Sequence, residues 1–431
     1  MSNKNTKSQV VGVLGGAVIL LSTGGAFADS VSVTNIFSAA TPARASEVNQ
    51  NFTDVEAAVN DNDARITALE SVSGGGGAVP ENIDCSTASS TAIQDAVDSG
   101  VKVINLSGSC TENVLIDTDD VSLIGDGTAI LTAIDNTTPA LAIDGARRIF
   151  LNNLTVTGGS NSIHIVDGAS VFIEDVTVNG AVAGPAALLP TGVGVFASTN
   201  SILTFAGGNT ISGDDGDTSS VLLLAGVQAR IKGSDNVFNI GAEVAGELPV
   251  AVDLFTNSTL LQFDEGTGNQ INGSISVEGG SKMFLQSVAI NGEEMGVYDS
   301  SSISLQPQST DAITVVLEAI EIGSSSLLDM GDEGFPVTIN NAGVDGVMRL
   351  LDHSTLGSFS NNLINMDVEL FRGSSIDASS NTTIGGNLSV NGFSSVIFTG
   401  IVASAVLGNV SCNNSEANEF DIGDAFSNLC P

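Results

Sequence analysis

Two short charged motifs are the best candidates for chemistry in this sequence. Gly213-Asp214-Asp215 is followed closely by Arg230-Ile231-Lys232. Paired carboxylates suit inverting glycoside hydrolysis, in which one acts as general acid and the other activates water, while a nearby cation binds an acidic sugar. Asp214, Asp215, Arg230 and Lys232 are therefore the candidate catalytic residues of a polysaccharide-active enzyme.

The same residues also fit a purely structural interpretation. Asp214, Asp215 and Asp217 would form an acidic turn. Arg230 and Lys232 would be alternate outward residues of a β-strand, because successive side chains of a strand point to opposite faces. The enzyme hypothesis requires the carboxylates and the cations to converge on one substrate position, whereas the structural interpretation does not.

Acidic turns are also candidate Ca²⁺ sites, because Ca²⁺ prefers several oxygen ligands. No turn here has the spacing of an EF-hand or of the glycine-rich nonapeptide repeat, so we expect millimolar affinity at best. No other cofactor is predicted. The candidate ligands are Asp119, Asp120, Asp214, Asp215 and Asp217.

A degenerate repeat must position all of these residues. Its clearest copy runs from Ser162 to Gly180 and contains an alternating strand, a corner of small residues, and a second alternating strand. Ile163 and Ile165 share one face of the first strand, and Val171 and Ile173 share one face of the second. Related corners recur about every 20 to 30 residues, the spacing of a solenoid coil. They include Ser198-Thr199-Asn200, Gly226-Val227-Gln228, Thr256-Asn257-Ser258, Gly279-Gly280-Ser281, Ser300-Ser301-Ser302, Gly323-Ser324-Ser325, His353-Ser354-Thr355, Gly373-Ser374-Ser375 and Gly392-Phe393-Ser394.

One such coil cannot bury its apolar face, but stacked coils form a continuous core. Val, Ile, Thr, Ser and Gly dominate, and no sustained pattern of period 3.6 follows residue 80. The sequence therefore predicts an all-β protein, a single-stranded parallel β-helix over residues 81–411.

The first coils carry a family resemblance. The segments Val101 to Cys110 and Val121 to Gly127 resemble the opening coils of the pectate-lyase-like β-helix superfamily, and the similarity extends loosely over residues 81–411. It implies a right-handed helix, but the fold hosts lyases, hydrolases, adhesins and inert stalks. Polygalacturonases of this superfamily combine Asn-Thr-Asp, Asp-Asp, Gly-His-Gly and Arg-Ile-Lys motifs, of which only the Asp-Asp and Arg-Ile-Lys elements occur here.

Composition excludes several kinds of partner. The chain has 49 acidic and 12 basic residues, a net charge of −37, no Trp and one Tyr. This excess of negative charge argues against nucleic acid and other strongly anionic partners, which need clustered Lys and Arg. The scarcity of flat aromatic side chains disfavours a sugar-processing cleft.

Residues 1–28 are predicted to be a signal peptide. Lys4 and Lys7 precede an apolar stretch. Ala26-Phe27-Ala28 has the small-x-small pattern of a cleavage site, so we expect cleavage between Ala28 and Asp29. The competing interpretation is a membrane anchor, but the apolar stretch is shorter than the roughly 20 residues of a membrane-spanning helix. We expect an exported chain without a transmembrane segment, located outside the cell, on its surface or in the periplasm. Loss of the two lysines leaves 49 acids and 10 bases, a net charge of −39.

Residues 29–70 precede the β-helix and contain heptad-spaced apolar residues from Val48 to Leu69. They predict a short coiled coil that forms an oligomer through residues 46–70; the alternative is one amphipathic helix packed on the first coil. A glycine-rich linker, residues 71–80, follows. The stretch Phe37 to Phe52 resembles an N-terminal segment of many bacterial exported and tail-fibre-like proteins.

Four cysteines form two local pairs in the sequence. In an oxidising compartment we expect the disulfides Cys85–Cys110 and Cys412–Cys430, although three pairings are possible. The second bridge would close a C-terminal cap, residues 412–431.

The sequence leaves two functional hypotheses. The first is an exported, non-enzymatic β-helix protein that acts as an extracellular or cell-surface structural or adhesin-like element and binds itself, a surface or a glycan. The second is a divergent polysaccharide lyase or glycoside hydrolase that uses Asp214, Asp215 and Arg230.

Overall fold

The structure is a computed structural model that contains two units, residues Met1–Gly77 and Ala78–Pro431. It describes residues 44, 46, 49–53, 55, 79–180, 192–213, 219–240, 250–263, 266–307, 313–331, 335–343, 346–379, 382–401, 406–413, 416–421 and 426–428. The predicted signal peptide, its cleavage site at Ala28/Asp29, the linker up to residue 78 and most heptad positions lie outside these residues. In the first unit, residues 49–53 are helical and the Thr53 hydroxyl donates to the Asn49 carbonyl (3.1 Å).

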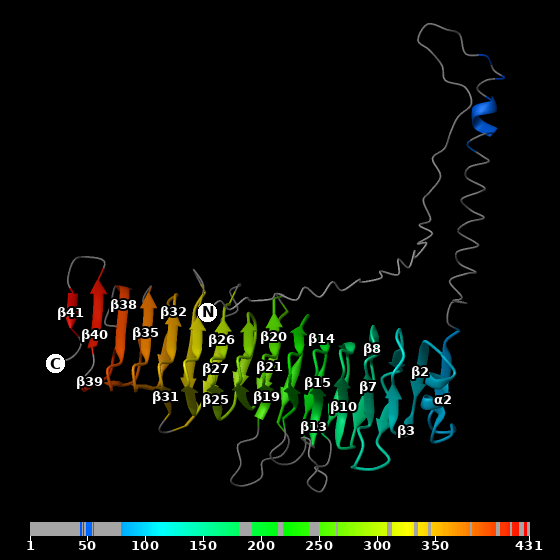
Figure 1. The fold of residues 1–431 in the computed structure, drawn as a ribbon, viewed down its shortest axis with the longest axis horizontal. Coiled ribbons are helices and arrows are strands. Elements are labelled where there is room, and N and C mark those ends of the chain that lie inside the picture. Colours follow the sequence, from blue (N-terminus) through cyan, green and yellow to red (C-terminus); the bar gives the residue numbers. More distant parts are fainter. Residues whose placement is uncertain are drawn as a thin grey trace, which may run out of the picture. The chain divides into compact units, whose positions relative to one another are not determined.

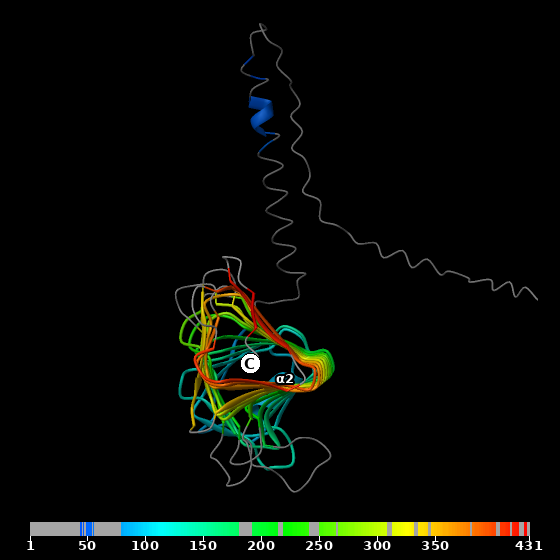
Figure 2. The ribbon, with the colours of Figure 1, turned by 90° about the vertical axis from the view of Figure 1, so that its left-hand side faces the viewer.

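The second unit is an all-β parallel solenoid of the right-handed type, as predicted. Each coil adds one strand to each of three sheets, and strands of successive coils follow one another along the solenoid (Figure 1). Seen along its length, the coils superpose in one closed outline (Figure 2). Among the described strands, β40 and β41 alone pair antiparallel.

Sheet A has sixteen described strands. They are β1 (Glu81–Asp84), β2 (Val103–Ser107), β5 (Ser122–Gly125), β8 (Ile149–Asn152), β11 (Ser170–Glu174), β14 (Ile202–Gly207), β17 (Gln228–Ile231), β20 (Thr259–Gln262), β23 (Lys282–Leu285), β26 (Ser302–Leu305), β29 (Leu327–Met330), β32 (Thr355–Ser358), β35 (Ser375–Ser379), β38 (Ser395–Ile401), β40 (Glu416–Asp421) and β41 (Phe426–Asn428).

Sheet B has twelve described strands. They are β3 (Ser109–Thr111), β6 (Ile130–Thr132), β9 (Thr155–Thr157), β12 (Thr177–Asn179), β15 (Thr210–Ser212), β18 (Val237–Asn239), β21 (Gln270–Asn272), β24 (Ala289–Asn291), β27 (Ile313–Leu317), β30 (Val337–Asn341), β33 (Leu363–Asn365) and β36 (Thr383–Ile384).

Sheet C has thirteen described strands. They are β4 (Val114–Ile116), β7 (Leu141–Asp144), β10 (Asn161–Val166), β13 (Val193–Ala197), β16 (Val221–Leu223), β19 (Val250–Leu254), β22 (Ser274–Val277), β25 (Glu294–Val297), β28 (Ala319–Ile322), β31 (Val347–Leu350), β34 (Asp367–Leu370), β37 (Leu388–Asn391) and β39 (Val410–Asn413).

The core runs through the centre of the solenoid. The alternation predicted for residues 162–180 is confirmed, since Ile163, Ile165 and Ile173 have no exposed surface. The residues between them face outward. Each inward side chain stacks on its equivalents in the neighbouring coils, so Ile163 lies between Leu141 and Val195.

The corner between sheets C and A is the corner that the repeat predicted. At several coils, non-glycine residues there adopt left-handed backbone conformations, for example Thr256 and Asn257, with φ of 52° and 60°. A buried serine follows, and these serines form a ladder. The backbone N–H of Ser258 donates to Ser281 Oγ, and the N–H of Ser281 donates to Ser301 Oγ, both at 3.1 Å.

A second ladder lies at the corner between sheets A and B. The buried Asn209 amide donates to Asn236 Oδ1 (2.8 Å), and the Asn236 amide donates to Asn269 Oδ1 (3.0 Å). Asn209 Oδ1 accepts the backbone N–H of Val176, and Asn269 Oδ1 accepts that of Asn236, both at 3.0 Å. Buried amides need such partners, because an unpaired buried polar group is destabilising.

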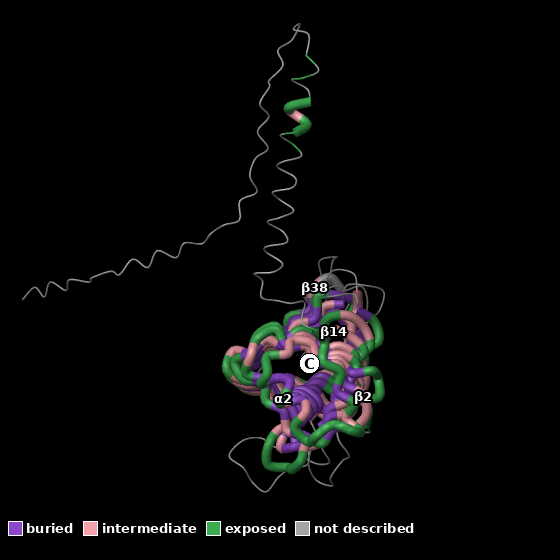
Figure 3. Tube along the Cα trace, turned by 90° about the vertical axis from the view of Figure 1, so that its right-hand side faces the viewer, coloured by how far each residue is buried: buried purple, intermediate pink, exposed green. Residues whose placement is uncertain are grey.

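Helix α2 (Ala92–Asp98) closes the N-terminal end of the core with buried Ile93, Ala96 and Val97. The carboxylate of Glu112 accepts the N–H groups of Ile93 (3.1 Å) and Gln94 (2.7 Å) at the start of this helix. Figure 3, which views the solenoid from this end, shows α2 within the outline of the coils. The N-terminal groups of a helix lack partners inside the helix, so Glu112 ties α2 to the solenoid.

The structure contains the predicted Cys85–Cys110 disulfide, with Cα atoms 4.7 Å apart. Cys412 is also disulfide-bonded. Cys430 lies outside the described residues, so its pairing stays a prediction. In the described part of the chain, no helix is long and apolar enough to cross a membrane.

The asparagine ladder makes a testable contribution to stability. Asn236→Ala removes the acceptor of Asn209 and a donor to Asn269, and we expect a loss of about 1 to 3 kcal/mol in the free energy of unfolding, measured by denaturant titration. The matched control is Asn365→Ala, because Asn365 is exposed and its amide donates to the Asn340 Oδ1 atom at the surface (2.8 Å). The control should change stability by less than about 0.5 kcal/mol. Equal effects of the two substitutions would contradict a structural role of the ladder.

Candidate functional site

Arg230 and Lys232 lie on the outer side of sheet A, at and just after the end of β17. Both are exposed, while the alternating residues Ala229 and Ile231 are buried, as the strand interpretation predicted. Asp214, Asp215 and Asp217 lie outside the described residues. Their convergence with Arg230 therefore stays a prediction.

Asp119 and Asp120 lie at a corner between sheets C and A, where they bind Arg148. The Arg148 guanidinium donates to Asp120 Oδ1 (2.5 Å) and Oδ2 (2.8 Å), and its hydrogen bond lowers the pKa of Asp120. Asp119 Oδ1 accepts the N–H of Arg147 (2.8 Å). No group of three or more metal-binding side chains is placed to hold an ion within the described ranges. Ca²⁺ binding therefore stays a prediction.

Charged side chains gather instead on the outer face of sheet C. In-register pairing puts Asp253 of β19 in one row with Ser276, Gly296, Glu321, Arg349 and Glu369 of the following coils. Glu278, Glu294 and Tyr298 flank this row. We call these residues the sheet C strip, namely Asp253, Glu278, Glu294, Tyr298, Glu321, Arg349 and Glu369.

Tyr298, the one tyrosine of the chain, lies at the centre of the sheet C strip. Its ring covers Gly296, where a Cβ atom would approach Tyr298 Cε2 to 2.6 Å, and its other edge lies near Gly323. Its hydroxyl makes hydrogen-bonding contacts with the carboxylates of Glu294 and Glu321. Burial, followed by the charges of Glu321 and Glu294, raises the pKa of Tyr298, so its hydroxyl stays protonated at neutral pH. The two glycines thus make room for an aromatic ring held flat on the sheet.

Asp253 has the most perturbed carboxyl group of the strip. Burial raises its pKa to about 7, and the charge of Glu278 contributes. Its Oδ1 atom is buried without a hydrogen-bond partner, and Ser219 Oγ lies 3.5 Å from Oδ2. Burial also raises the pKa of Glu294, with a further contribution from Glu321. Carboxyl groups with raised pKa values in a row are common at functional sites.

Arg349 supplies the positive charge of the strip and pairs with Glu369 (3.3 Å). Both side chains are partly exposed, so this ion pair contributes little to stability. The other carboxylates of the strip accept hydrogen bonds and, when protonated, donate them. The arrangement therefore suits a ligand rich in hydroxyl groups or positive charge.

The N-terminal part of the same face is apolar. Phe196 and Leu222 occupy the outward row two coils and one coil before Asp253, respectively. They are only 3% and 5% exposed and form a cluster with Val193. The ring of His164 meets that of Phe196 edge-on at 4.7 Å. Burial lowers the pKa of His164. The two histidines lie apart, as expected, with His164 facing outward on β10 and His353 at a corner.

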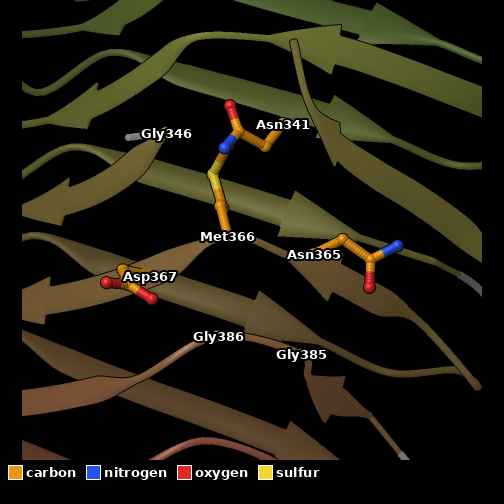
Figure 4. Close-up of a pocket in the computed structure, with 7 residues that line it drawn as sticks. All are labelled: Asn341, Gly346, Asn365, Met366, Asp367, Gly385 and Gly386. Carbon is orange, nitrogen blue, oxygen red and sulfur yellow. The ribbon is translucent and has the colours of Figure 1, made fainter. Parts of the chain in front are cut away.

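A pocket of about 310 Å³ lies at the corner between sheets B and C (Figure 4). Its one ionisable side chain, Asp367, accepts the backbone N–H of Asn387 (2.7 Å) and contacts the Asn387 amide with both oxygens. A second pocket of about 340 Å³ lies at the corner between sheets A and B, beside Asn269. The polar groups of both corners bind neighbouring coils, so the sheet C strip is the better candidate site.

Sequence reasoning missed the sheet C strip because its members come from different coils. Asp253, Glu278 and Glu321 are widely separated along the chain and share no local motif. Aligning the coils on their predicted corners and comparing the outward positions of each coil could have placed these residues in one row.

No protein-family model, curated protein or solved structure matches the chain. The β-solenoid itself is clear from the sheet topology. Membership of the pectate-lyase-like superfamily stays a prediction.

Asp253 predicts a dependence of stability on pH. Its pKa rises on folding from 3.8 to about 7, so its favourable contribution is complete below pH 4 and is lost as the pH rises through 7. The full effect is at most roughly 4 kcal/mol. Asp253→Asn removes this titration, and we expect the variant to melt at a higher temperature than the parent at pH 8 but not at pH 4.

The matched control is Asp377→Asn, which changes an exposed carboxylate on β35. It should leave the difference between pH 4 and pH 8 unchanged. If the melting temperatures of the parent and of Asp253→Asn change equally between pH 4 and pH 8, Asp253 is not held in a buried, neutral form.

Proposed function

We propose that this chain is an exported, non-enzymatic β-helix protein that acts as an extracellular or cell-surface structural element and binds a neutral glycan through the sheet C strip. The observation that carries the proposal is Tyr298, held flat on the sheet between Glu294 and Glu321. Binding sites need polar groups fixed before the ligand arrives, and these three residues are already in contact.

The chemistry of the strip favours a polymer of hydroxyl groups. Carboxylates accept hydrogen bonds from hydroxyls, and the Tyr298 ring offers an apolar surface with a polar end. The residues repeat with the coils, about 4.8 Å apart, so they present a linear array to a linear ligand. Glu278, Glu294, Glu321 and Glu369 would repel an anionic polymer.

The solenoid supports the structural part of the proposal. Serine and asparagine ladders reinforce two corners, and α2 with the Cys85–Cys110 disulfide closes one end. Repeat arrays depend on nearest-neighbour contacts and on protected ends. These features favour a rigid element that displays its outer faces.

The second candidate function is a polysaccharide-active enzyme. The observation that favours it is Asp253, because a carboxyl group with a pKa of about 7 can donate a proton at neutral pH. A carboxylate elsewhere in the strip, such as Glu278, would then act as the base or nucleophile.

Binding to a panel of insoluble neutral polysaccharides tests the proposal. We expect the mature chain to bind at least one of them, and Glu321→Gln or Tyr298→Phe to weaken that binding about tenfold, because each removes a polar contact of the strip. Asp377→Asn on sheet A is the matched control and should bind like the parent. Unchanged binding by both strip variants would place the ligand elsewhere.

The same experiment separates binding from catalysis. If the parent releases reducing or unsaturated sugar ends and Asp253→Asn does not, the chain is an enzyme and the adhesin-like proposal is wrong. Binding without release of such ends supports the proposal.

A further inference from the structure

A basic and aromatic patch lies on the outer face of sheet A. Arg230, Lys232 and Lys282 are exposed there, on and beside β17 and β23. Between them Phe263 is 57% exposed, and its ring lies 5.0 Å from that of Phe284. We call these residues, with Leu261, the sheet A patch.

The patch is unusual in a chain with a net charge of −37. The outward positions of β14, β17, β20, β23 and β26 carry no carboxylate. Arg148, Arg349 and Arg372 each form an ion pair with an acidic residue. By contrast, the three cations of the patch form no ion pair with any described residue. Exposed aromatic rings and arginine side chains are enriched at protein interfaces.

We propose that the sheet A patch binds the sheet C strip of a second copy of this chain. The strip offers Glu278, Glu294 and Glu321 as partners of opposite charge. Both surfaces run along a solenoid of the same coil spacing, about 4.8 Å, so the cations of the β17 and β23 coils can face carboxylates spaced along the strip. Phe263 adds apolar surface that the contact removes from water.

The two faces give this contact a definite symmetry. Sheets A and C are separate sheets of one solenoid, so the contact joins unlike surfaces and leaves a free patch and a free strip on every pair. Such a contact continues from copy to copy. It therefore forms open, side-by-side arrays, whereas a coiled coil through residues 46–70 would give an oligomer of fixed size.

Charge reversal on each face tests the contact in the mature full-length chain. The first variant carries Arg230→Glu, Lys232→Glu and Lys282→Glu, and the second carries Glu278→Lys, Glu294→Lys and Glu321→Lys. In sedimentation velocity at about 0.15 M salt, where the Debye length is about 8 Å, we expect the parent to grow in size with concentration without a plateau. Each variant alone should associate at least about tenfold more weakly.

Sedimentation of an equimolar mixture of the two variants is the decisive measurement. The reversed patch of the first matches the reversed strip of the second, and their remaining faces also match, so the mixture should regain the open growth of the parent. The matched control is Arg147→Glu, Arg148→Glu and Arg372→Glu, which causes the same change of net charge at exposed corners. It should assemble like the parent.

The proposal is overturned if the parent shows only a fixed oligomer, if the control fails as the patch variant does, or if the mixture does not recover. If the parent does not self-associate but binds an anionic polymer, and the patch variant loses that binding, the patch serves a different partner and the proposal is wrong. Circular dichroism verifies that each variant is folded. The second copy and the glycan would share the sheet C strip, so the patch variant should bind the glycan at least as well as the parent. The failure of this inference and that of the proposed function therefore give different results.

Discussion

Parallel, in-register stacking of coils is the constraint on which this structure depends. Each residue sits above and below its equivalents in the neighbouring coils, about 4.8 Å away. An inward position must therefore suit a column of similar side chains, as Leu141, Ile163 and Val195 do. Where a column is polar, its members must satisfy one another inside the core. Ser258, Ser281 and Ser301 do so at one corner, and Asn209, Asn236 and Asn269 at another.

The same constraint organises the surface. An outward column is a row along the solenoid, and its chemistry changes only as the sequence of successive coils changes. On sheet C the row passes from the buried Phe196 and Leu222 to Asp253 and then to Glu321 and Arg349. Residues that are far apart in sequence thereby form continuous surfaces such as the sheet C strip and the sheet A patch. A fixed interior leaves these rows free to carry function.

This arrangement explains what could be predicted from the sequence. Alternation in a single coil predicts which side chains face inward, so Ile163, Ile165 and Ile173 were placed correctly. The left-handed corners were also predictable, because small, Asn and Gly residues mark them. The asparagine ladder was missed although Asn209, Asn236 and Asn269 each directly precede a strand of sheet B.

The candidate site was harder to predict, because motifs such as Asp214-Asp215 are local in sequence, whereas the strip is local only in space. Burial of Asp253 on an outward position depends on tertiary packing, and no local pattern encodes it.

Native-state hydrogen exchange at the serine corner tests most directly whether the ladders hold the coils in register. The backbone N–H groups of Ser258, Ser281 and Ser301 donate to serine hydroxyls of the next coil, and those of Ser281 and Ser301 also donate to the corner carbonyls of Glu278 and Tyr298. We predict that they exchange as slowly as the amides of the adjoining strands β20, β23 and β26. Exchange as fast as in exposed turns would contradict the account, since the corners would then open independently of the strands.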